Sequence, residues 1–339
     1  MPIRVGEMLL EPGARGEYLI PLGRRPDGSQ SGVPLIGLAG ALPGPTLGII
    51  AGIHGDEYEG PEAARALLAE LDPAQVRGGI ICAPVANVAA YEDFHRVGSI
   101  DHLDLNRVFP GKCDGSLTER VAATLVREVV EQCTTLLDLH SAGFAYDLHP
   151  YVGFNATPGL TGESSFALAK AFGVPVLYAS TPFPNVLRLE AAKREIPAIL
   201  VEIGGEARCD PAGVERMKQG LRNVLRQLGM IEGSLEGTPD DYTIVRAPPG
   251  GEFAHVATGG FIRNQSALGA VVEKGQVLGT IVDLYGKPLE EITAHVSGLV
   301  LSFRTIPVVR TGDWGYSIVE VIGQTTFAES MASALGDLG

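Results

Sequence analysis

A histidine and a glutamate stand three residues apart, where an apolar run gives way to a helical pattern, in the stretch "GIHGDEYEG". Side chains at this spacing can reach one point from the same turn, so His54 and Glu57 could share a metal ion. Zinc binds imidazole nitrogen and carboxylate oxygen, and three protein ligands leave a fourth position open for water. The alternative is a capped turn in which Asp56 and Glu57 only favour the start of a helix.

The third ligand of such a site should also stand at the end of a strand, because ligands gather at the carboxyl ends of strands in parallel α/β sheets. His140 ends the apolar run in "LLDLHSAG" and meets this requirement. The sequence therefore predicts a zinc site made of His54, Glu57 and His140. The alternative is chance, because a short H-x-x-E match arises often, and His140 alone could be a hydrogen-bonded core histidine.

A hydrolytic zinc site also needs an acid or a base beside the bound water. Glu202 ends the apolar run in "PAILVEIGGE", where an isolated carboxylate is costly unless it is paired or functional. We therefore predict that Glu202 is the catalytic base, with Glu206 in the following loop as the fallback. The alternative is a structural pair with a nearby arginine. A serine hydrolase built on Ser141 is disfavoured, because the sequence has no G-x-S-x-G elbow.

A fourth polar stretch, "DHLDLNRVFPG", offers groups that suit a substrate carboxylate. The Arg107 guanidinium is a bidentate fork and Asn106 adds an amide. Asp104 could hold a zinc-binding histidine or the arginine in place. Asp138 lies two residues before His140 on the same strand face and is a candidate to support that ligand from behind. The alternative is an ordinary loop in which Asp104 and Arg107 form an ion pair.

The elements that must position these residues alternate between strands and helices. After two strands in the first forty residues, the sequence predicts strands over 45–53, 78–87, 134–143, 174–180 and 197–206. It predicts helices over 60–71, 116–133, 163–173, 184–196 and 210–230. Ser116 and Glu119 form a predicted capping box. This order is typical of an α/β fold with a mostly parallel or mixed sheet flanked by helices on both faces.

The pattern changes near residue 234, where short strands and glycine-rich turns replace the alternation. We expect a zinc hydrolase α/β domain over 1–233, a small all-β barrel-sandwich domain over 234–325 and a C-terminal tail over 326–339. The stretches "VEKGQVLGTI" and "AHVSGLV" are similar to lipoyl carrier domains. The expected hairpin tip lacks the lysine that a carrier needs, which favours a structural role.

The composition excludes several classes of function. The formal net charge of −14 argues against a sequence-independent nucleic-acid binder, which needs a basic face. No apolar run approaches the length of a membrane span, and no signal peptide is recognisable at the start. The four cysteines form no C-x-x-C pair, which is typical of a cytoplasmic enzyme with reduced thiols. The sequence allows a homo-oligomer without requiring one.

Taken together and in this order, "GIHGDEYEG", "DLNRVFPG", "LLDLHSAG" and "VEIGGE" resemble the succinylglutamate desuccinylase/aspartoacylase family of zinc amidohydrolases. The resemblance covers roughly residues 40–230 and implies a fold related to the zinc carboxypeptidases. "HGDEYEGP" is particularly similar to the subgroup that includes the deacetylases of N-acetyl-diaminobutyrate.

The resemblance also implies roles for individual residues. It implies that His54, Glu57 and His140 bind one Zn²⁺ per chain and that Glu202 is the catalytic glutamate. Asn106 and Arg107 would hold the substrate carboxylate. Aspartoacylase-like members carry an arginine shortly before the "DLNR" stretch. Here Arg96 is the only candidate, at a different spacing, and Arg188 is a further candidate for binding substrate.

The expected function is zinc-dependent hydrolysis of the amide bond of a small N-acyl amino acid, which releases a carboxylic acid and the amino acid. Glu202 would act as the base and then as the acid, and a cation such as Arg107 would stabilise the oxyanion. One alternative is a carboxypeptidase-like metallopeptidase that acts on short peptides. Another is a relative that binds metal or senses a ligand without catalysis. A β domain that caps the cleft would favour the small substrate.

Overall fold

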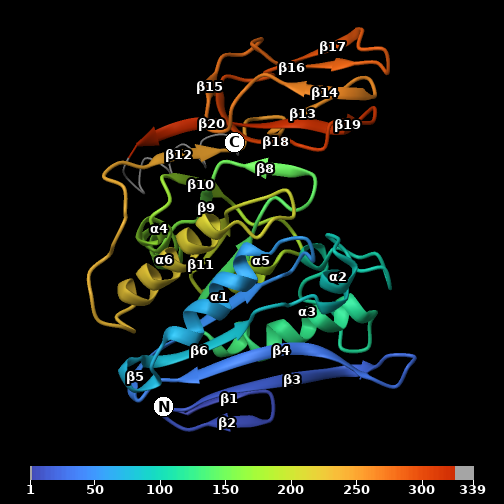
Figure 1. Ribbon diagram of the computed structural model, residues 1–339. Helices are drawn as coiled ribbons and strands as arrows, with labels where there is room; N and C mark the ends of the chain where they lie inside the picture. The colour runs from blue at the N-terminus through green and yellow to red at the C-terminus, as the bar shows by residue number, and fades with distance from the viewer. Residues whose placement is uncertain (1, 325–339) are drawn as a thin grey trace.

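The protein is described here by a computed structural model of residues 2–324 (Figure 1). The predicted tail over 326–339 lies outside these residues. One large mixed sheet runs through the molecule, and helices cover both of its faces. None of the helices in residues 2–324 is long and apolar enough to cross a membrane.

The α/β part of the sheet has eight strands, and the predicted site residues follow three that run parallel. In order across the sheet the strands are β3 (Arg15–Arg24), β4 (Gln30–Ala39), β6 (Arg77–Ala83), β5 (Leu42–Ala51), β7 (Thr135–His140), β11 (Ala198–Glu202), β9 (Tyr151–Asn155) and β10 (Val176–Ser180). Strands β6, β5, β7 and β11 are parallel. The carboxyl ends of β5, β7 and β11 therefore meet at one edge of the sheet.

The helices are divided between two buried apolar cores, one on each face of the sheet. The first core contains residues of α1 (Glu59–Glu70), α4 (Leu160–Phe172) and α6 (Pro211–Gln227). The second contains residues of α3 (Leu117–Glu128) and α5 (Leu187–Ala192). A short helix, α2 (Val88–Asp93), packs beside the turn after β5. This arrangement confirms the predicted fold class.

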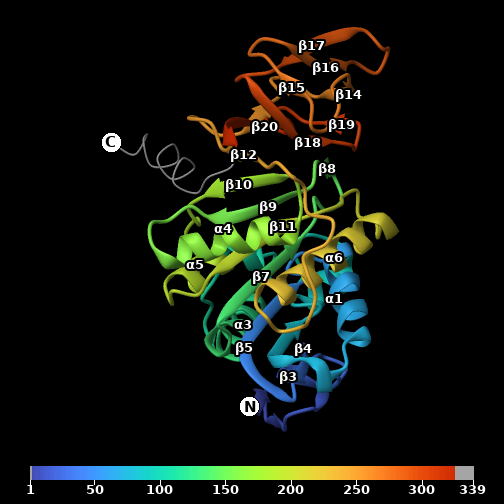
Figure 2. The same cartoon turned by 90° about the vertical axis from the view of Figure 1, so that its left-hand side faces the viewer.

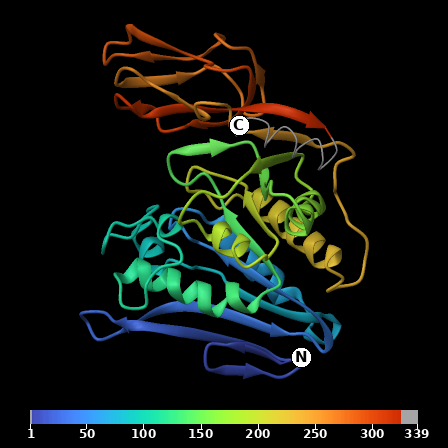
Figure 3. The same ribbon diagram turned by 180° about the vertical axis from the view of Figure 1, so that it is seen from behind.

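The C-terminal part is built from strands that run antiparallel to one another. Some of them extend the large sheet of the α/β part, and four others form a sheet of their own. Its strands are β12 (Thr243–Arg246), β13 (Phe253–His255), β14 (Gly260–Asn264), β15 (Val271–Val272), β16 (Val277–Val282), β17 (Pro288–Thr293), β18 (Gly298–Arg304), β19 (Val308–Val309) and β20 (Trp314–Gln324). Strand β12 pairs with β10 on one side and β20 on the other. Figure 2 shows these strands stacked beyond β10, and Figure 3 shows the N-terminal strands at the opposite end.

A third apolar core lies wholly within the C-terminal part, with Leu278, Ile281 and Tyr316 among its fully buried members. Because this part has its own core, we propose that the boundary near residue 233 separates two domains. The shared sheet through β12 would then fix the orientation of the second domain against the first.

Two local departures from the sequence prediction have physical reasons. The helix predicted over 184–196 is shorter, since α5 ends at Ala192. Glu195 adopts a positive φ and Pro197 follows Ile196, which disfavours helical backbone before it. The predicted helix over 116–133 has its capping box, but α3 ends at Glu128 and a 3₁₀ turn follows.

Strand β9 was not predicted, because "YVGFN" is short and carries a central glycine. It runs antiparallel to β11 and brings Tyr151 opposite Glu202. The residues from Tyr146 to Leu148 form a further short strand, β8, which pairs with β18 of the C-terminal part. Residues of these two strands lie beside Glu202, the predicted catalytic residue.

Candidate active site

The turn between β5 and α1 is held tightly against a neighbouring helix. A Cβ atom on Gly55 would overlap the carbonyl group of Ala90 in α2, so only glycine allows this approach. The backbone N–H of Gly55 donates to the carbonyl of His95 at 3.0 Å. His54 and Glu57 on either side of this glycine are buried. The turn therefore presents both side chains in a fixed direction.

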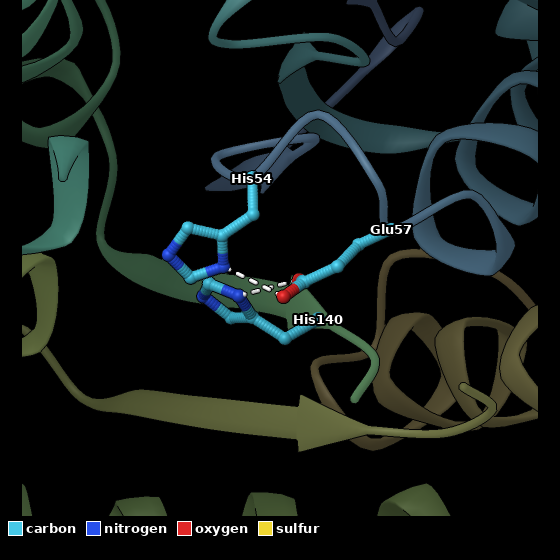
Figure 4. A group of neighbouring side chains, drawn as sticks. All are labelled: His54, Glu57 and His140. Atoms are coloured by element: carbon cyan, nitrogen blue, oxygen red, sulfur yellow. Dashed lines mark hydrogen bonds and ion pairs between the residues drawn. The ribbon is translucent and has the colours of Figure 1, made fainter. Parts of the chain in front are cut away.

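His54, Glu57 and His140 converge on one buried point (Figure 4). Nδ1 of His54 lies 2.7 Å from Oε1 of Glu57. Nδ1 of His140 lies 2.9 Å from Oε2 of the same carboxylate. One ligand atom from each residue lies within 4.8 Å of the others. The parallel pairing of β5 with β7 places His140 beside the turn, since Ala51 pairs with Leu139.

A carboxylate lies behind each histidine. Nε2 of His140 is 2.8 Å from Oδ1 of Asp138, and Nε2 of His54 is 3.2 Å from Oδ1 of Asp104. An outer carboxylate favours the proton on Nε2 and leaves the Nδ1 lone pair pointing inward. Two such lone pairs and the Glu57 carboxylate would then face one another as acceptors. This donor set requires a cation and fits zinc.

The pKa of His140 also indicates that positive charge is favoured at this point. Burial disfavours its charged form, but Asp138 and Glu57 outweigh this effect and raise the pKa of His140 well above its ordinary value. A metal ion would meet the same demand, because it neutralises the carboxylates without a proton on the ring.

Glu202 lies at the end of β11, paired in register with His140 on β7. Its Oε2 atom is buried and has no hydrogen-bond partner among residues 2–324. Burial raises the pKa of Glu202 to about 8. A carboxyl group with a pKa raised in this way can accept and release a proton, as a general base and a general acid must. Glu206, the fallback, forms an ion pair with Arg208 and does not line the cavity.

These groups line a cavity of about 470 Å³. Its walls come from the carboxyl ends of the parallel strands, from loops of the α/β part and from the C-terminal strands. Phe253 and Trp314 of the C-terminal part line it, and Trp314 stacks on Tyr146 with ring centroids 3.7 Å apart. Ser141 also lines the cavity, and its backbone N–H donates to Glu57 at 3.2 Å.

The residues predicted to bind substrate have different surroundings. Arg96 pairs with Asp104 at 2.9 Å, and its Nη1 lies 3.4 Å from Nδ1 of His54. Its guanidinium therefore lies beside the metal donors. Arg107 is exposed at the cavity, and within residues 2–324 its side chain donates a hydrogen bond only to the carbonyl of Asn106, at 2.8 Å. No ion pair joins Arg107 to Asp104 within residues 2–324.

Asn106 has a positioning role in the structure. Its Oδ1 accepts the N–H of Leu187 at 2.9 Å, which fixes the start of α5. Its amide nitrogen lies 3.5 Å from Nε2 of His140. The same helix carries Arg188, which is buried and donates to Asn155 at 3.3 Å and to Ser180 at 3.2 Å. Arg188 lines the cavity and has no carboxylate within ion-pair distance in the described part of the chain.

Several cavity residues were not predicted from the sequence. Tyr151, Glu252, Phe253 and Trp314 lie in or beside short strands whose patterns resemble those of many surface segments. The only tryptophan of the chain was a usable hint, because tryptophan is enriched at binding surfaces. The rest become visible only when the C-terminal strands are placed against the α/β part.

Comparison with known proteins supports the family resemblance seen in the sequence. Residues 43–228 match the succinylglutamate desuccinylase/aspartoacylase catalytic domain. The N-α-acetyl-L-2,4-diaminobutyric acid deacetylase of Halomonas elongata is 30% identical over 284 residues, which are 82% of this chain and 83% of that protein.

Solved structures resemble more than nine-tenths of the chain. The ectoine utilization protein EutE (DoeB) from Ruegeria pomeroyi, in its product-bound form, has a TM-score of 0.86 at 27% identity over 95% of this chain and 98% of that one. A succinylglutamate desuccinylase/aspartoacylase from Rhodobacter sphaeroides has a TM-score of 0.83 at 27% identity over 91% and 96% of the two chains. With the catalytic-domain match and the curated relative, this shows that the chain belongs to the succinylglutamate desuccinylase/aspartoacylase family.

Proposed function

We propose that the protein is a zinc-dependent deacylase, which hydrolyses the amide bond of a small N-acyl amino acid to a carboxylic acid and the free amino acid. The observation that carries the proposal is a pair of features in one cavity. Three buried donors converge on one point, and the adjacent strand ends at Glu202, whose buried Oε2 has no hydrogen-bond partner among residues 2–324. Membership of a deacylase family supports the same reaction class.

One zinc ion per chain would be held by His54, Glu57 and His140. When bound there, zinc acts as a Lewis acid and lowers the pKa of water toward neutrality. Asp104 and Asp138 would keep both imidazoles oriented with their Nδ1 atoms toward the ion.

Glu202 would take a proton from the attacking water and deliver it to the nitrogen of the leaving amine. Its buried, unpartnered Oε2 supports this assignment. Arg96 would face the negative charge that develops on the amide oxygen, because its Nη1 lies beside His54. The sequence assigned Arg107 to the substrate carboxylate and offered it for the oxyanion only as a second use. Arg107 contacts none of the three donors among the residues described, so we keep it at the substrate carboxylate.

A small substrate suits the cavity better than a peptide. The C-terminal strands close one side of it with Phe253 and Trp314. This wall is the observation that favours a deacylase over the carboxypeptidase-like alternative. We also propose a cytoplasmic location, supported by four cysteines that are all free.

The proposal is tested with a panel of substrates, with and without a chelator. The panel contains N-acetyl derivatives of neutral, acidic and diamino acids together with dipeptides, and the assay measures the amine released. We expect turnover of an N-acetyl amino acid that stops on chelation and returns with zinc. Turnover of the dipeptides alone would establish the peptidase instead, and full activity in metal-free protein would contradict the zinc requirement.

Arg107 and Arg188, which have no carboxylate partner within the described residues, should hold the α-carboxylate of the substrate. Replacing Arg188 with methionine keeps much of the side-chain volume and removes the charge. We expect KM to rise about 10- to 100-fold with a smaller change in kcat, because the loss of a charge-assisted hydrogen bond weakens substrate binding by about this factor. Steady-state kinetics on the N-acyl amino acid and on its carboxamide check the role. A loss that is equal for both substrates would show that Arg188 does not bind the carboxylate.

A further inference from the structure

A second cavity, of about 490 Å³, lies apart from the candidate active site. Within residues 2–324 the two cavities have no lining residue in common. The second one is formed where the hairpin tip between β3 and β4 meets α2, the loop after α2 and the first turn of α3. Its volume is in the range of small-molecule binding sites. The walls of this hairpin pocket include Leu22, Arg24, Arg25, Ile100, Leu117 and Arg120.

The acidic residues of the hairpin pocket already have partners. Glu92 of α2 forms an ion pair with Arg25 at 2.7 Å, which ties the hairpin tip to this helix. Oδ2 of Asp93 accepts the backbone N–H of Ser99 at 2.6 Å, and this hydrogen bond lowers the pKa of Asp93. Three arginines and these two acids line the pocket, which leaves one net positive charge.

Two of the three arginines can still bind a ligand. Arg24 and Arg120 have no carboxylate partner within residues 2–324. Nη1 of Arg24 donates to the carbonyl of Gly28 at 2.9 Å, and Nε of Arg120 donates to the carbonyl of Gly115 at 2.9 Å. A guanidinium has five N–H donors, so each arginine keeps donors for a carboxylate or a phosphate.

Apolar side chains lie beside these arginines. Leu22 and Leu117 are half-buried in the wall, and Ile100 is 66% exposed. Guanidinium groups next to an exposed aliphatic surface complement an anion that carries an apolar body better than they complement a bare inorganic ion.

Helix α2 connects the hairpin pocket to the metal-binding turn. Ala89, Glu92 and Asp93 of this helix line the pocket. The carbonyl of Ala90, on the same helix, lies directly against Gly55 in the turn between β5 and α1. A ligand in the pocket would therefore rest on a helix that also supports the metal donors.

The chain after α2 makes a second connection. Phe94 and His102 both have a positive φ, of 57° and 55°, and non-glycine residues hold this conformation only where their surroundings enforce it. Between them, Ser99 and Ile100 line the hairpin pocket, while Arg96 lines the candidate active site. The position of Arg96 therefore depends on a short segment, 95–101, that also forms a wall of the hairpin pocket.

We propose that the hairpin pocket is an effector site for a small organic anion with an apolar body, and that its occupancy raises turnover. Arg24 and Arg120 would bind the anionic group. A ligand that fits the pocket as it stands here favours the arrangement in which Arg96 lies beside the metal donors. The binding site is independent of the function proposed above, whereas the effect on turnover rests on it, because Arg96 there faces the oxyanion.

Binding is tested by calorimetry on the full-length zinc-loaded protein with benzoate, phenyl phosphate and benzamide. We expect an anion to bind with a Kd of about 1 mM or below. Benzamide, the neutral isostere of benzoate, should bind at least about 10-fold more weakly, because it cannot form the charge-assisted hydrogen bonds. The stronger of the two anions shows whether the site prefers a carboxylate or a phosphate. Failure of both anions to bind would overturn the proposal.

Four variants locate the bound anion. Arg120→Met and Arg24→Met should each weaken binding about 10-fold or more. Arg24 is exposed on the hairpin tip, so its replacement does not disturb the support that Arg120 gives to the loop at Gly115. Arg127→Met, at an exposed position of α3 outside the pocket, is the matched control and should keep native binding and turnover.

Arg188→Met should also retain full binding of the anion, since Arg188 lines the other cavity. Binding that is lost in Arg188→Met and kept in Arg24→Met and Arg120→Met would place the anion at the substrate site and overturn the proposal.

The effect on the active site has two measurements. At saturating substrate the bound anion should raise kcat about 5-fold, and this rise should be absent in Arg24→Met. A competitor at the substrate site would raise KM and leave kcat unchanged. Hydrogen exchange in peptides that cover residues 94–102 should slow about 5-fold or more when the anion is bound.

These measurements also separate the two proposals. If no amide is hydrolysed, the deacylase proposal fails, while calorimetry and hydrogen exchange still decide whether the pocket binds the anion and holds the Arg96 segment. An anion that binds through Arg24 and Arg120 but changes neither kcat nor the exchange of residues 94–102 would overturn the effector role.

Discussion

Replacing Glu202 with glutamine is expected to lower kcat about 10³-fold while the protein keeps its zinc. Glutamine has nearly the same shape, so the end of β11 should be undisturbed, but it can neither take a proton from water nor give one to the amine. Because Glu202 contributes no atom to the three-donor cluster, metal content should stay at one ion per chain. The measurements are steady-state kcat on the best substrate of the panel and elemental analysis of the purified variant.

The matched control for this variant is Glu206→Gln. Glu206 follows four residues later but lies outside the cavity and pairs with Arg208. It should retain native turnover. If Glu202→Gln kept most of the rate, or if both variants lost it equally, the proton transfer would have to be assigned to another group.

The second large effect is expected for His140. Replacing it with alanine removes one of three donors from a point at which a carboxylate and two imidazoles converge. We expect the variant to lose zinc and to lose activity by at least about 10³-fold. The native protein should also melt at a higher temperature with zinc than with chelator, because a ligand that binds only the folded state stabilises it by about 4 kcal/mol at a thousand times its Kd. In the variant this shift should disappear.

The control for His140→Ala is His255→Gln, which alters an exposed histidine that does not line the cavity. Its metal content, activity and zinc-dependent shift should equal those of the native protein. The experiment measures metal per chain, kcat/KM and melting temperature on all three proteins. One zinc per chain in His140→Ala would remove this histidine from the metal site.

Much of the α/β fold could be predicted because its elements are encoded locally. The apolar runs that became β5, β7 and β11 are short, continuous and bounded by glycine or polar residues, as expected for strands buried on both faces. The capping box at Ser116 marks the start of α3. The antiparallel β9 escaped prediction because five residues with a central glycine carry little periodicity.

The sequence by itself determined which residues could do chemistry and where along the chain they stand. His54, His140 and Glu202 each follow a buried strand, and parallel strands bring their carboxyl ends to one edge. That rule needs no knowledge of contacts between distant segments. The rule was sufficient to predict that the three metal donors and Glu202 lie together, and all four line one cavity.

The tertiary structure alone decided which other groups share that cavity. An ion pair with Asp104 holds Arg96 beside the metal donors. The short helix α5 carries Arg188 at the cavity, and Glu252 lines the same cavity from the C-terminal part. Tyr178 and Glu252 are separated by 74 residues, and their contact exists only because β12 and β20 extend the sheet beyond β10. Charge pairing and burial depend on such contacts, so no local pattern could have revealed which charges would be left without partners.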